Sequence, residues 1–403
     1  MRVALVYRNF NLGGSIERDT VLLARSLTAH GVEVHCYTDP ERRSAAADGL
    51  PFHDVRPSLR GGSRFILPLE RLTFATRATR RLRLDRARYD LVHVSGPSGW
   101  EHDVVTVHEV VRAGQRRWPA RAGRGYRAAG LRAAVAPLLR PEIVVGRAVQ
   151  RMQFSSGRFR QLIAVTEEVR ADLVAEFGIA EELVTLVPYA VPVEVFGEAR
   201  PLGLRGRLGL GAADQILLFV GHEFERKGLA EALDALVVLP RTVHLVVVGD
   251  GPAAVFGRRA EEAGVGDRVH FLGRTEEPER AFADADLFVL PTRDEPWGIP
   301  LIEAMAAGVP VVTTLAAGAA GVVAEAGAGV LVPTRSPRDV AEAVGALLAD
   351  PDRRRRLGAA GRAASVKFSE EAQARAVLRA YERALTRPPL PAHAGAPVLT
   401  GAR

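Results

Sequence analysis

The sequence comprises 403 residues, of which 47 % are hydrophobic and 25 % charged, with a formal net charge of +7. This composition is typical of a soluble globular protein that is long enough for two domains, each with its own core. The single cysteine, Cys36, excludes an internal disulfide and is typical of a reducing cytoplasm. Because no apolar run reaches about 18 residues, the sequence also excludes a membrane-spanning helix.

The positive charge is concentrated in residues 56–132, which carry 17 arginines against six acidic residues. Solvated helices would account for this excess, because 52 of the 54 basic residues of the chain are Arg. The alternative is a surface that contacts anionic lipid headgroups or a phosphorylated acceptor, at the inner face of the cytoplasmic membrane. Nucleic acid is not an expected partner, since the arginines are not interleaved with stacking aromatics and no DNA- or RNA-binding motif accompanies them.

Short apolar runs alternate with helical patterns along the chain, which predicts parallel sheets with helices on both faces. In the first half, strands are predicted at 2–7, 32–38, 91–96, 103–108, 162–166 and 184–188. In the second half, they are predicted at 216–221, 243–249, 269–273, 287–292, 309–314 and 329–333. Two sets of about six strands imply an α/β protein with two doubly wound, Rossmann-like domains.

The domain boundary is expected near the start of 191–214, a stretch rich in Gly, Pro and Arg. We therefore predict an N-terminal domain over 1–192 and a C-terminal domain over 193–368. A last helix, assigned to 369–386, has Ser369 as its N-cap and acidic residues in its first turn. The tail 387–403, rich in Pro, Ala and Gly, is predicted to be disordered.

The stretch "EPWGIPLIEA" (295–304) follows a predicted strand, and ligands of open α/β sheets bind at the carboxyl ends of strands. Glu295 precedes a helix that begins at Gly298 and Ile299, and Glu303 lies inside that helix. Carboxylates can bind the vicinal hydroxyls of a sugar or a ribose, and the helix start can bind a diphosphate. Helix capping would explain Glu295 but not Glu303, so the pattern favours a nucleotide-sugar.

Two other loops present anion-binding features. In "GHEFERKGL" (221–229), Arg226 and Lys227 are expected at a helix start, where they could cradle a diphosphate; a solvated basic pair is the alternative. Gly13 and Gly14 precede the first helix, so their backbone could approach a ligand closely. A simple helix entry explains this glycine pair equally well.

Other patterns argue against competing functions. "GDGPAA" (249–254) lacks the third glycine of a dinucleotide fingerprint, which disfavours an NAD(P)-dependent oxidoreductase. Asp284 and Asp286 precede a strand, so we interpret them as a turn and expect no metal site. His108 ends a predicted strand, where a structural role and a substrate contact both remain open.

Several segments resemble, in the same order, the retaining glycosyltransferases of family 4. They are "GGSIER", "FVGHEFERKGL", "VVVGDGP", "VHFLGR", "ADLFVLPTRDEPWGIPLIEAMAAGVPVV" and "GAGVLVPTRSP". Glu295 and Glu303 match the E-x7-E motif of that family. The resemblance covers about residues 1–386. In detail, the chain is similar to the lipopolysaccharide-core glucosyl- and heptosyl-type members of the family. It implies the GT-B architecture: two Rossmann-like domains facing a cleft, with the last helix crossing back to the first domain.

The resemblance also implies the reaction. A sugar would pass from a nucleotide diphosphate-sugar to a hydroxyl of a saccharide or lipid-linked acceptor, with retention and without a metal or other cofactor. Arg226 and Lys227 would hold the diphosphate, Glu295 the donor sugar and Glu303 the ribose. The alternatives are a nucleotide-sugar epimerase or another enzyme of the GT-B fold.

Further contacts are implied by the same resemblance. The N–H groups that follow Gly298 at Ile299 would meet phosphate, and the backbone of Arg274 and Thr275 would frame the base. Gly13 and Gly14 would lie against the donor, and His108 would contact the transferred sugar near the reacting carbon. The chain departs from the family at "PYAV" (188–191), where many members have Pro-Asn-Gly-Val, so the hinge or the acceptor side is expected to differ.

Overall fold

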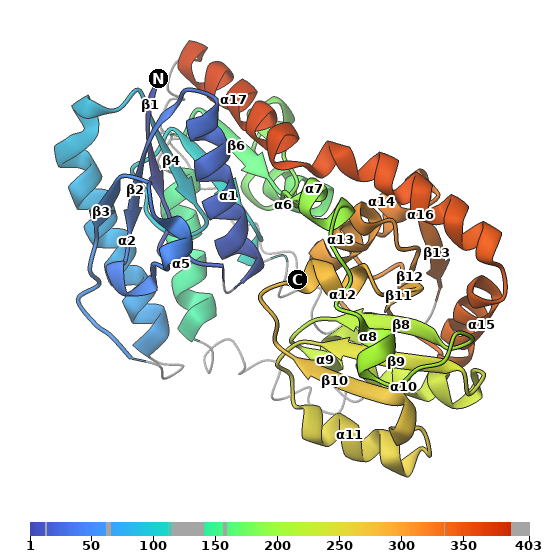
Figure 1. The fold of residues 1–403 in the computed structure, drawn as a ribbon. Helices are drawn as coiled ribbons and strands as arrows, with labels where there is room; N and C mark the ends of the chain where they lie inside the picture. Colours follow the sequence, from blue (N-terminus) through green and yellow to red (C-terminus); the bar gives the residue numbers. More distant parts are fainter. Residues whose placement is uncertain are drawn as a thin grey trace, which may run out of the picture. The chain divides into compact units, whose positions relative to one another are not determined.

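The computed structural model describes residues 1–12, 14–61, 66–111, 113, 141–155, 159–333 and 335–387. The chain divides into two compact units, each with its own sheet (Figure 1). Unit 1 comprises residues 1–190 and 370–403, and unit 2 comprises residues 191–369. Gly13 and, apart from Arg387, the tail expected to be disordered lie outside the described residues.

Unit 1 is built on a seven-stranded parallel sheet with the order β3-β2-β1-β4-β5-β6-β7. The strands are β1 (Arg2–Val6), β2 (Glu33–Thr38), β3 (Phe52–Asp54), β4 (Leu91–Ser95), β5 (Val104–Val107), β6 (Gln161–Ala164) and β7 (Val184–Leu186). Six of these were predicted. The edge strand β3 was missed because three residues, "FHD", carry no apolar run.

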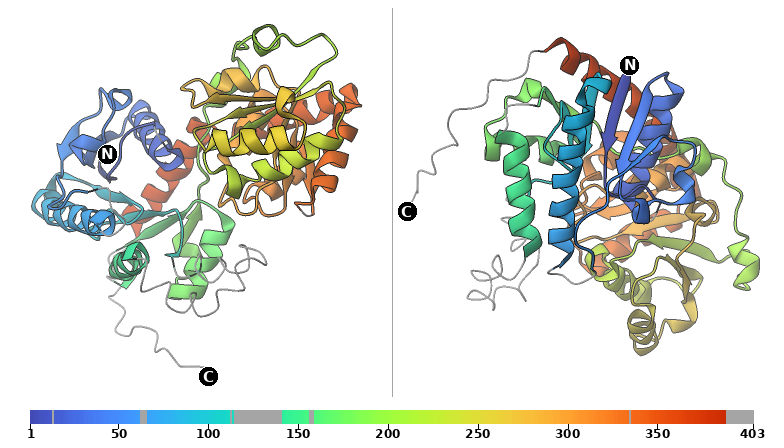
Figure 2. Two further views of the ribbon diagram at one scale, coloured as in Figure 1. Left: turned by 90° about the horizontal axis from the view of Figure 1, so that it is seen from below. Right: turned by 90° about the vertical axis from the view of Figure 1, so that its left-hand side faces the viewer.

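Helices cover both faces of this sheet. They are α1 (Ser15–Ala29), α2 (Ile66–Asp85), α5 (Pro141–Ser155), α6 (Glu167–Phe177) and α17 (Glu370–Thr386), with short 3-10 turns at η1 (Pro40–Arg42), η2 (Ala45–Ala47), η3 (Arg86–Arg88) and η5 (Glu181–Leu183). Helices α2 and α5 lie side by side (Figure 2). Alternate residues of β1 serve the two faces, because successive strand side chains point in opposite directions.

The two hydrophobic cores of unit 1 follow from that alternation. Val3 and Leu5 of β1 belong to the core that contains residues of α1 and α17. Ala4 and Val6 belong to the other, which contains residues of α2. Helix α17 packs on α1 and on β6, so the last helix returns to the first sheet, as the resemblance implied.

Unit 2 is built on a six-stranded parallel sheet with the order β10-β9-β8-β11-β12-β13. The strands are β8 (Gln215–Val220), β9 (Val243–Val248), β10 (Val269–Gly273), β11 (Leu287–Leu290), β12 (Val311–Thr314) and β13 (Gly329–Val332), all of them predicted. The helices are α7 (Val193–Gly197), α8 (Leu204–Arg207), α9 (Phe224–Lys227), α10 (Leu229–Val238), α11 (Ala253–Glu262), α12 (Pro278–Phe282), α13 (Ile299–Ala307), α14 (Ala320–Ala326), α15 (Pro337–Leu348) and α16 (Pro351–Ser365), with 3-10 turns at η6 (Gly266–Arg268) and η7 (Val366–Phe368).

In both sheets the first strand is the third in spatial order and the strand order reverses beside it, at β1/β4 and at β8/β11. Such a reversal is where doubly wound sheets bind ligands, outside the carboxyl ends of their strands. The predicted class of two doubly wound α/β sheets is therefore confirmed. Within the described ranges, no helix combines the length and the apolar character that crossing a membrane requires.

Candidate active site

Helix α13 begins where the sequence placed it. Gly298 adopts a left-handed conformation with φ of 97° directly before Ile299, the first helical residue. Glu303 lies in the middle of the helix and is only 3 % exposed. Glu295 is fixed by its backbone, because its N–H donates to the carbonyl of Ala316 and its carbonyl accepts from Gly318 N–H at 2.8 Å. The loop after β12 therefore holds the first glutamate of the motif in place.

The two cations were expected at the start of a helix, but they lie at the end of one helix, shortly before the next begins. Arg226 and Lys227 are the last residues of the one-turn helix α9, and α10 begins only after Gly228. Gly228 has φ of 84°, and a Cβ added there would lie 2.0 Å from the carbonyl oxygen of Pro291. This close approach of two loops breaks the helix, which sequence spacing did not reveal.

The two cations contact the first glutamate directly. Lys227 Nζ lies 2.6 Å from Glu295 Oε2, and Arg226 Nη1 lies 3.3 Å from the same oxygen. Arg226 also pairs with Glu223 at 2.6 Å. We call these four residues the charged cluster. In this cluster, the two cations expected to bind a diphosphate contact the carboxylate expected to bind a sugar.

Burial makes the charged cluster electrostatically strong. Lys227 is 8 % exposed, and its stem packs so closely on Gly221 that an added Cβ there would lie 2.2 Å from Lys227 Cδ. Burial works against the charge of Arg226, yet the neighbouring Glu295 carboxylate raises the pKa of this guanidinium above its ordinary value. Charges that are partly withdrawn from water interact more strongly than exposed ones, so an anion that enters here meets preorganised cations.

The expected base-binding residues lie on a separate loop. Arg274 and Thr275 follow β10, and Arg274 Nη1 lies 3.9 Å from Asp250 in the turn after β9. Asp250 also contacts His222 Nδ1 at 2.5 Å. The "GDGPAA" stretch is a tight turn into α11, as interpreted, and Asp250 lies within it. These contacts join the loops after β8, β9 and β10, but none involves Lys227 or Glu295.

The aspartates of the D-x-D spacing have structural contacts. Asp284 accepts from Leu204 N–H, and Asp286 accepts from Arg205 at 2.7 Å and from Ile216 N–H at 2.8 Å. Both thus hold the short helix α8 against the sheet. In the part of the chain that the structure describes, no group of three or more His, Cys, Asp or Glu side chains could hold a metal ion.

In unit 1, His108 directly follows β5, and hydroxyl groups flank both of its ring nitrogens. Nε2 lies 2.9 Å from Ser95 Oγ, and Nδ1 lies 2.8 Å from the Tyr189 hydroxyl. The His108 and Tyr189 rings stack with centroids 5.7 Å apart. Burial lowers the pKa of His108 to about 4. The imidazole is therefore neutral at pH 7 and is held in one plane.

A second histidine, on the neighbouring strand β4, has a similar arrangement of hydroxyl partners. His93 Nδ1 contacts the Tyr381 hydroxyl and Nε2 contacts Thr106 Oγ1, both at 2.7 Å, and burial lowers the pKa of His93 to about 3. Strand alternation places both pairs of side chains on the sheet face that α17 covers. We call this set the imidazole–hydroxyl cluster: His93, Ser95, Thr106, His108, Tyr189 and Tyr381.

Of this cluster, sequence reasoning named His108 as a candidate substrate contact and noted Tyr189 only as part of the "PYAV" departure from the family. The available signal was the polar residue at every second position of "LVHVS" and "VVTVH". The two tyrosines come from distant segments, so their contacts with the histidines depend on tertiary structure.

Gly14 is the N-cap of α1 and has an extended backbone. A Cβ added at Gly14 would lie 2.3 Å from Glu17 Oε2, so the absence of a side chain makes room for this carboxylate. Glu17 in turn accepts from Asn9 Nδ2 at 3.0 Å and lies at the positive end of the helix. In this structure the group that lies against Gly14 is therefore the Glu17 side chain, where the resemblance implied a donor.

Two protein-family models match the chain. The model described as Glycosyltransferase Family 4 matches residues 13–195, and the model described as Glycosyl transferases group 1 matches residues 204–364. A D-inositol 3-phosphate glycosyltransferase of Xylanimonas cellulosilytica is 33 % identical over 402 residues, with 91 % of each chain covered. The chain belongs to the glycosyltransferases of family 4.

The transferase is also similar to WaaG, the lipopolysaccharide glucosyltransferase of Escherichia coli. That protein is 32 % identical over 193 residues, which is 46 % of this chain and 52 % of WaaG. A crystal structure of WaaG matches with a TM-score of 0.71 at 24 % identity, covering 92 % of this chain and 98 % of that one. A structure of Alr3699/HepE of Anabaena in complex with UDP has a TM-score of 0.70 at 16 % identity, covering 95 % and 100 %.

These findings confirm the predicted class, a retaining glycosyltransferase with the GT-B fold. The relatives named above are glycosyltransferases rather than oxidoreductases or epimerases. The resemblance to lipopolysaccharide glucosyltransferases is matched by WaaG, whereas other curated relatives are named D-inositol 3-phosphate glycosyltransferases.

Proposed function

We propose that the transferase moves a sugar from a nucleotide diphosphate-sugar to a hydroxyl of a saccharide or lipid-linked acceptor, without a metal ion. The observation that carries this proposal is the charged cluster, in which two cations and a carboxylate meet at the carboxyl ends of β8 and β11. The fold likeness to HepE, whose structure contains UDP, supports a nucleotide donor.

The charged cluster would bind the reacting part of the donor. Arg226 and Lys227 hold the diphosphate and stabilise the negative charge that develops on it as it leaves, which is the role a metal ion has in other transferases. Glu295, which forms ion pairs with both cations in this structure, accepts hydrogen bonds from vicinal hydroxyls of the sugar. The N–H of Ile299, exposed by the turn at Gly298, donates to phosphate.

The rest of the donor would extend over neighbouring loops. Glu303 of α13 binds the ribose, and the backbone of Arg274 and Thr275 frames the base. Gly13 and Gly14 allow the donor to approach the first turn of α1. For Gly14, this approach requires Glu17 to move aside, since its carboxylate lies where an added Cβ would be.

In the scheme that we propose, retention results from attack on the face that the diphosphate leaves. The bond between the sugar C1 and the diphosphate oxygen breaks, the acceptor oxygen bonds to C1 on the same side, and the acceptor proton passes to the departing phosphate oxygen. No protein nucleophile enters this scheme. The chain contributes by orienting the donor, stabilising the leaving diphosphate and excluding water.

His108 would contact the transferred sugar only after a change of partners. Each imidazole nitrogen makes one hydrogen bond, and Ser95 and Tyr189 already use both. A sugar hydroxyl that binds His108 therefore has to displace the hydroxyl of Ser95 or of Tyr189. Alternatively, the sugar hydroxyl binds the Tyr189 hydroxyl and not the imidazole. Tyr189 replaces the Asn of many family members, so this contact would differ between this chain and those relatives.

We also propose a peripheral contact between the arginine-rich segment 56–132 and an anionic membrane, part of this segment lying outside the described residues. A lipid-linked acceptor would be reached from such a surface. Binding to vesicles that contain anionic lipid should fall steeply as salt rises and should disappear with neutral lipid. Salt-insensitive binding, or none, removes this part of the proposal.

A transfer assay tests the proposed function directly. UDP-, GDP-, ADP- and dTDP-sugars are offered in EDTA with inositol phosphate or a lipopolysaccharide-core saccharide as acceptor, and the product's anomeric configuration is read by NMR. The expected result is transfer from one nucleotide class with retention. Hydrolysis only, inversion, or activity that EDTA abolishes would contradict the proposal.

A further inference from the structure

Behind the charged cluster, the same two segments form a second set of ion pairs. The loop after β11 is joined to α9 by its backbone, because Arg293 N–H donates to the carbonyl of Arg226 at 2.9 Å and Thr292 Oγ1 donates to the same oxygen at 3.1 Å. Arg226 in turn donates a short hydrogen bond to the carbonyl of Asp294. The segment that carries Glu295 and the segment that carries the cations are thus bonded side by side.

Neighbouring side chains of these segments make separate contacts. Lys227 pairs with Glu295 in the charged cluster, whereas Glu225 pairs with Arg293 at 2.7 Å. The second pair lines a cavity of about 730 Å³ between α10, α11 and the loops after β11, β12 and β13. Adjacent residues of the same two segments therefore form two features. One is the pair of charges proposed to bind the donor, and the other is part of the wall of the cavity.

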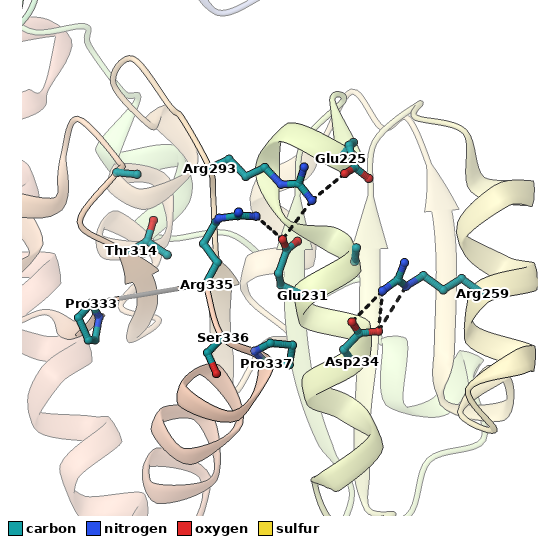
Figure 3. A pocket seen from close by; sticks show the side chains of 12 residues that line it. Glu225, Glu231, Asp234, Arg259, Arg293, Thr314, Pro333, Arg335, Ser336 and Pro337 are labelled. Carbon is teal, nitrogen blue, oxygen red and sulfur yellow. Dashed lines mark hydrogen bonds and ion pairs between the residues drawn. The ribbon is translucent and has the colours of Figure 1, made fainter. Parts of the chain in front are cut away.

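Glu231 is the buried carboxylate of this cavity. It is the third residue of α10, is 8 % exposed, and its Oε1 accepts from Arg293 at 3.2 Å and from Arg335 in a short contact. Figure 3 shows both arginines pointing toward Glu231, while Arg259 points toward Asp234 farther along the helix. Glu231 therefore connects α10 to the loops after β11 and β13.

The anchoring of Arg293 depends mainly on Glu231. Its other partner, Glu225, is 65 % exposed, and exposed ion pairs contribute little. A buried carboxylate with two arginine partners is different, because removing it takes this compensating charge from Arg335 and leaves Arg293 with the exposed Glu225. Without Glu231, the loop that carries Glu295 loses its inner attachment to α10.

We infer that Glu231 is a positioning residue for the diphosphate-binding part of the donor site. By holding the Arg293 side chain, it adds to the backbone hydrogen bonds that place the 292–295 loop against Arg226, and so contributes to the spacing between Glu295 and Lys227. Glu231 itself touches no donor atom in this scheme. The inference rests on the proposed function, because it concerns how well the charged cluster receives a diphosphate.

The test compares Glu231→Gln with Asp234→Asn, a control on the same helix that breaks a different ion pair of the same cavity. Binding of UDP, GDP and ADP in EDTA is measured by calorimetry, and the tightest diphosphate is compared with its nucleoside. Glu231→Gln should weaken the diphosphate about ten- to a hundredfold, because small misplacements of binding groups have effects of this size. Nucleoside binding should stay unchanged, and Asp234→Asn should leave both ligands unaffected.

A double variant separates positioning from loss of stability. Glu231→Gln combined with Arg335→Met removes a cation left uncompensated, so it should recover part of the thermal midpoint without recovering diphosphate affinity. Recovery of both together would overturn the inference, as would equal diphosphate binding by Glu231→Gln and Asp234→Asn. If the wild type binds none of the three diphosphates, the proposed function fails as well; wild-type binding that is indifferent to Glu231 defeats this inference alone.

Discussion

The two candidate clusters of this transferase, one in each unit, differ in their electrostatics. The charged cluster of unit 2 holds two cations and two carboxylates within ion-pair distance, whereas the imidazole–hydroxyl cluster of unit 1 holds two neutral histidines between hydroxyl groups. A diphosphate needs preorganised positive charge, while a sugar hydroxyl needs a hydrogen-bond acceptor or donor. The charged cluster therefore has groups for both a diphosphate and, through Glu295, sugar hydroxyls, whereas the imidazole–hydroxyl cluster has groups for hydroxyls alone.

Glu295→Gln should have the largest effect. It removes the carboxylate that we assign to the sugar hydroxyls and that now neutralises Lys227, so transfer should fall about 10²- to 10³-fold, as when one essential transition-state contact is removed. Affinity for the free nucleoside diphosphate should hold or increase, because the anion no longer competes with Glu295 for the cations. Initial rates and calorimetric titrations of the same variant check both parts, and a parallel loss of transfer and diphosphate affinity would count against the assignment.

The two tyrosine hydroxyls of unit 1 should differ in their effects. Tyr381→Phe leaves His93 Nδ1 buried without its partner and should lower the free energy of unfolding by about 1–3 kcal/mol, with transfer nearly unchanged. Tyr189→Phe should lower kcat about tenfold, the equivalent of one lost hydrogen bond near the reacting sugar. Urea unfolding and steady-state kinetics of both variants test this difference. Equal effects on kcat would show that neither hydroxyl has a role in transfer that the other lacks.

Acid should weaken unit 1 through its buried histidines. Their pKa values of about 3 for His93 and about 4 for His108 lie below the 6.5 of an exposed imidazole. As the pH falls below 6.5, the unfolded chain binds protons that the folded chain does not, so stability is lost, by up to about 1.4 kcal/mol per pH unit for each histidine. Asp19 has the opposite sign, since burial raises its pKa to about 6 and the folded state takes up a proton below that value.

Urea unfolding at pH 5 and pH 7, with the transitions of the two units fitted separately, measures this smallest effect. His93→Asn should flatten the dependence of unit 1 on pH, and Asp19→Asn should steepen it. Unchanged dependence in both variants would mean that these groups titrate alike in the folded and unfolded chain.

The sequence was sufficient to predict the strands and the glutamate motif, but not the contacts within each cluster. Apolar runs of four to six residues mark buried parallel strands, and only the polar edge strand β3 escaped that rule. The contact between Lys227 and Glu295 depends on the left-handed turn at Gly228, which ends α9 one residue after the lysine. Glu231 carried no signal at all, because its partners Arg293 and Arg335 lie 62 and 104 residues away.

The central claim is that the chain's own cations, rather than a metal ion, bind the donor diphosphate. Calorimetric titration of UDP, GDP and ADP in EDTA tests it with the wild type, with Lys227→Met, and with Lys367→Met, which alters the only other lysine of the chain. We predict that one diphosphate binds the wild type and Lys367→Met equally and binds Lys227→Met at least tenfold more weakly. Binding that needs a divalent ion, or that is the same in all three proteins, would contradict the account.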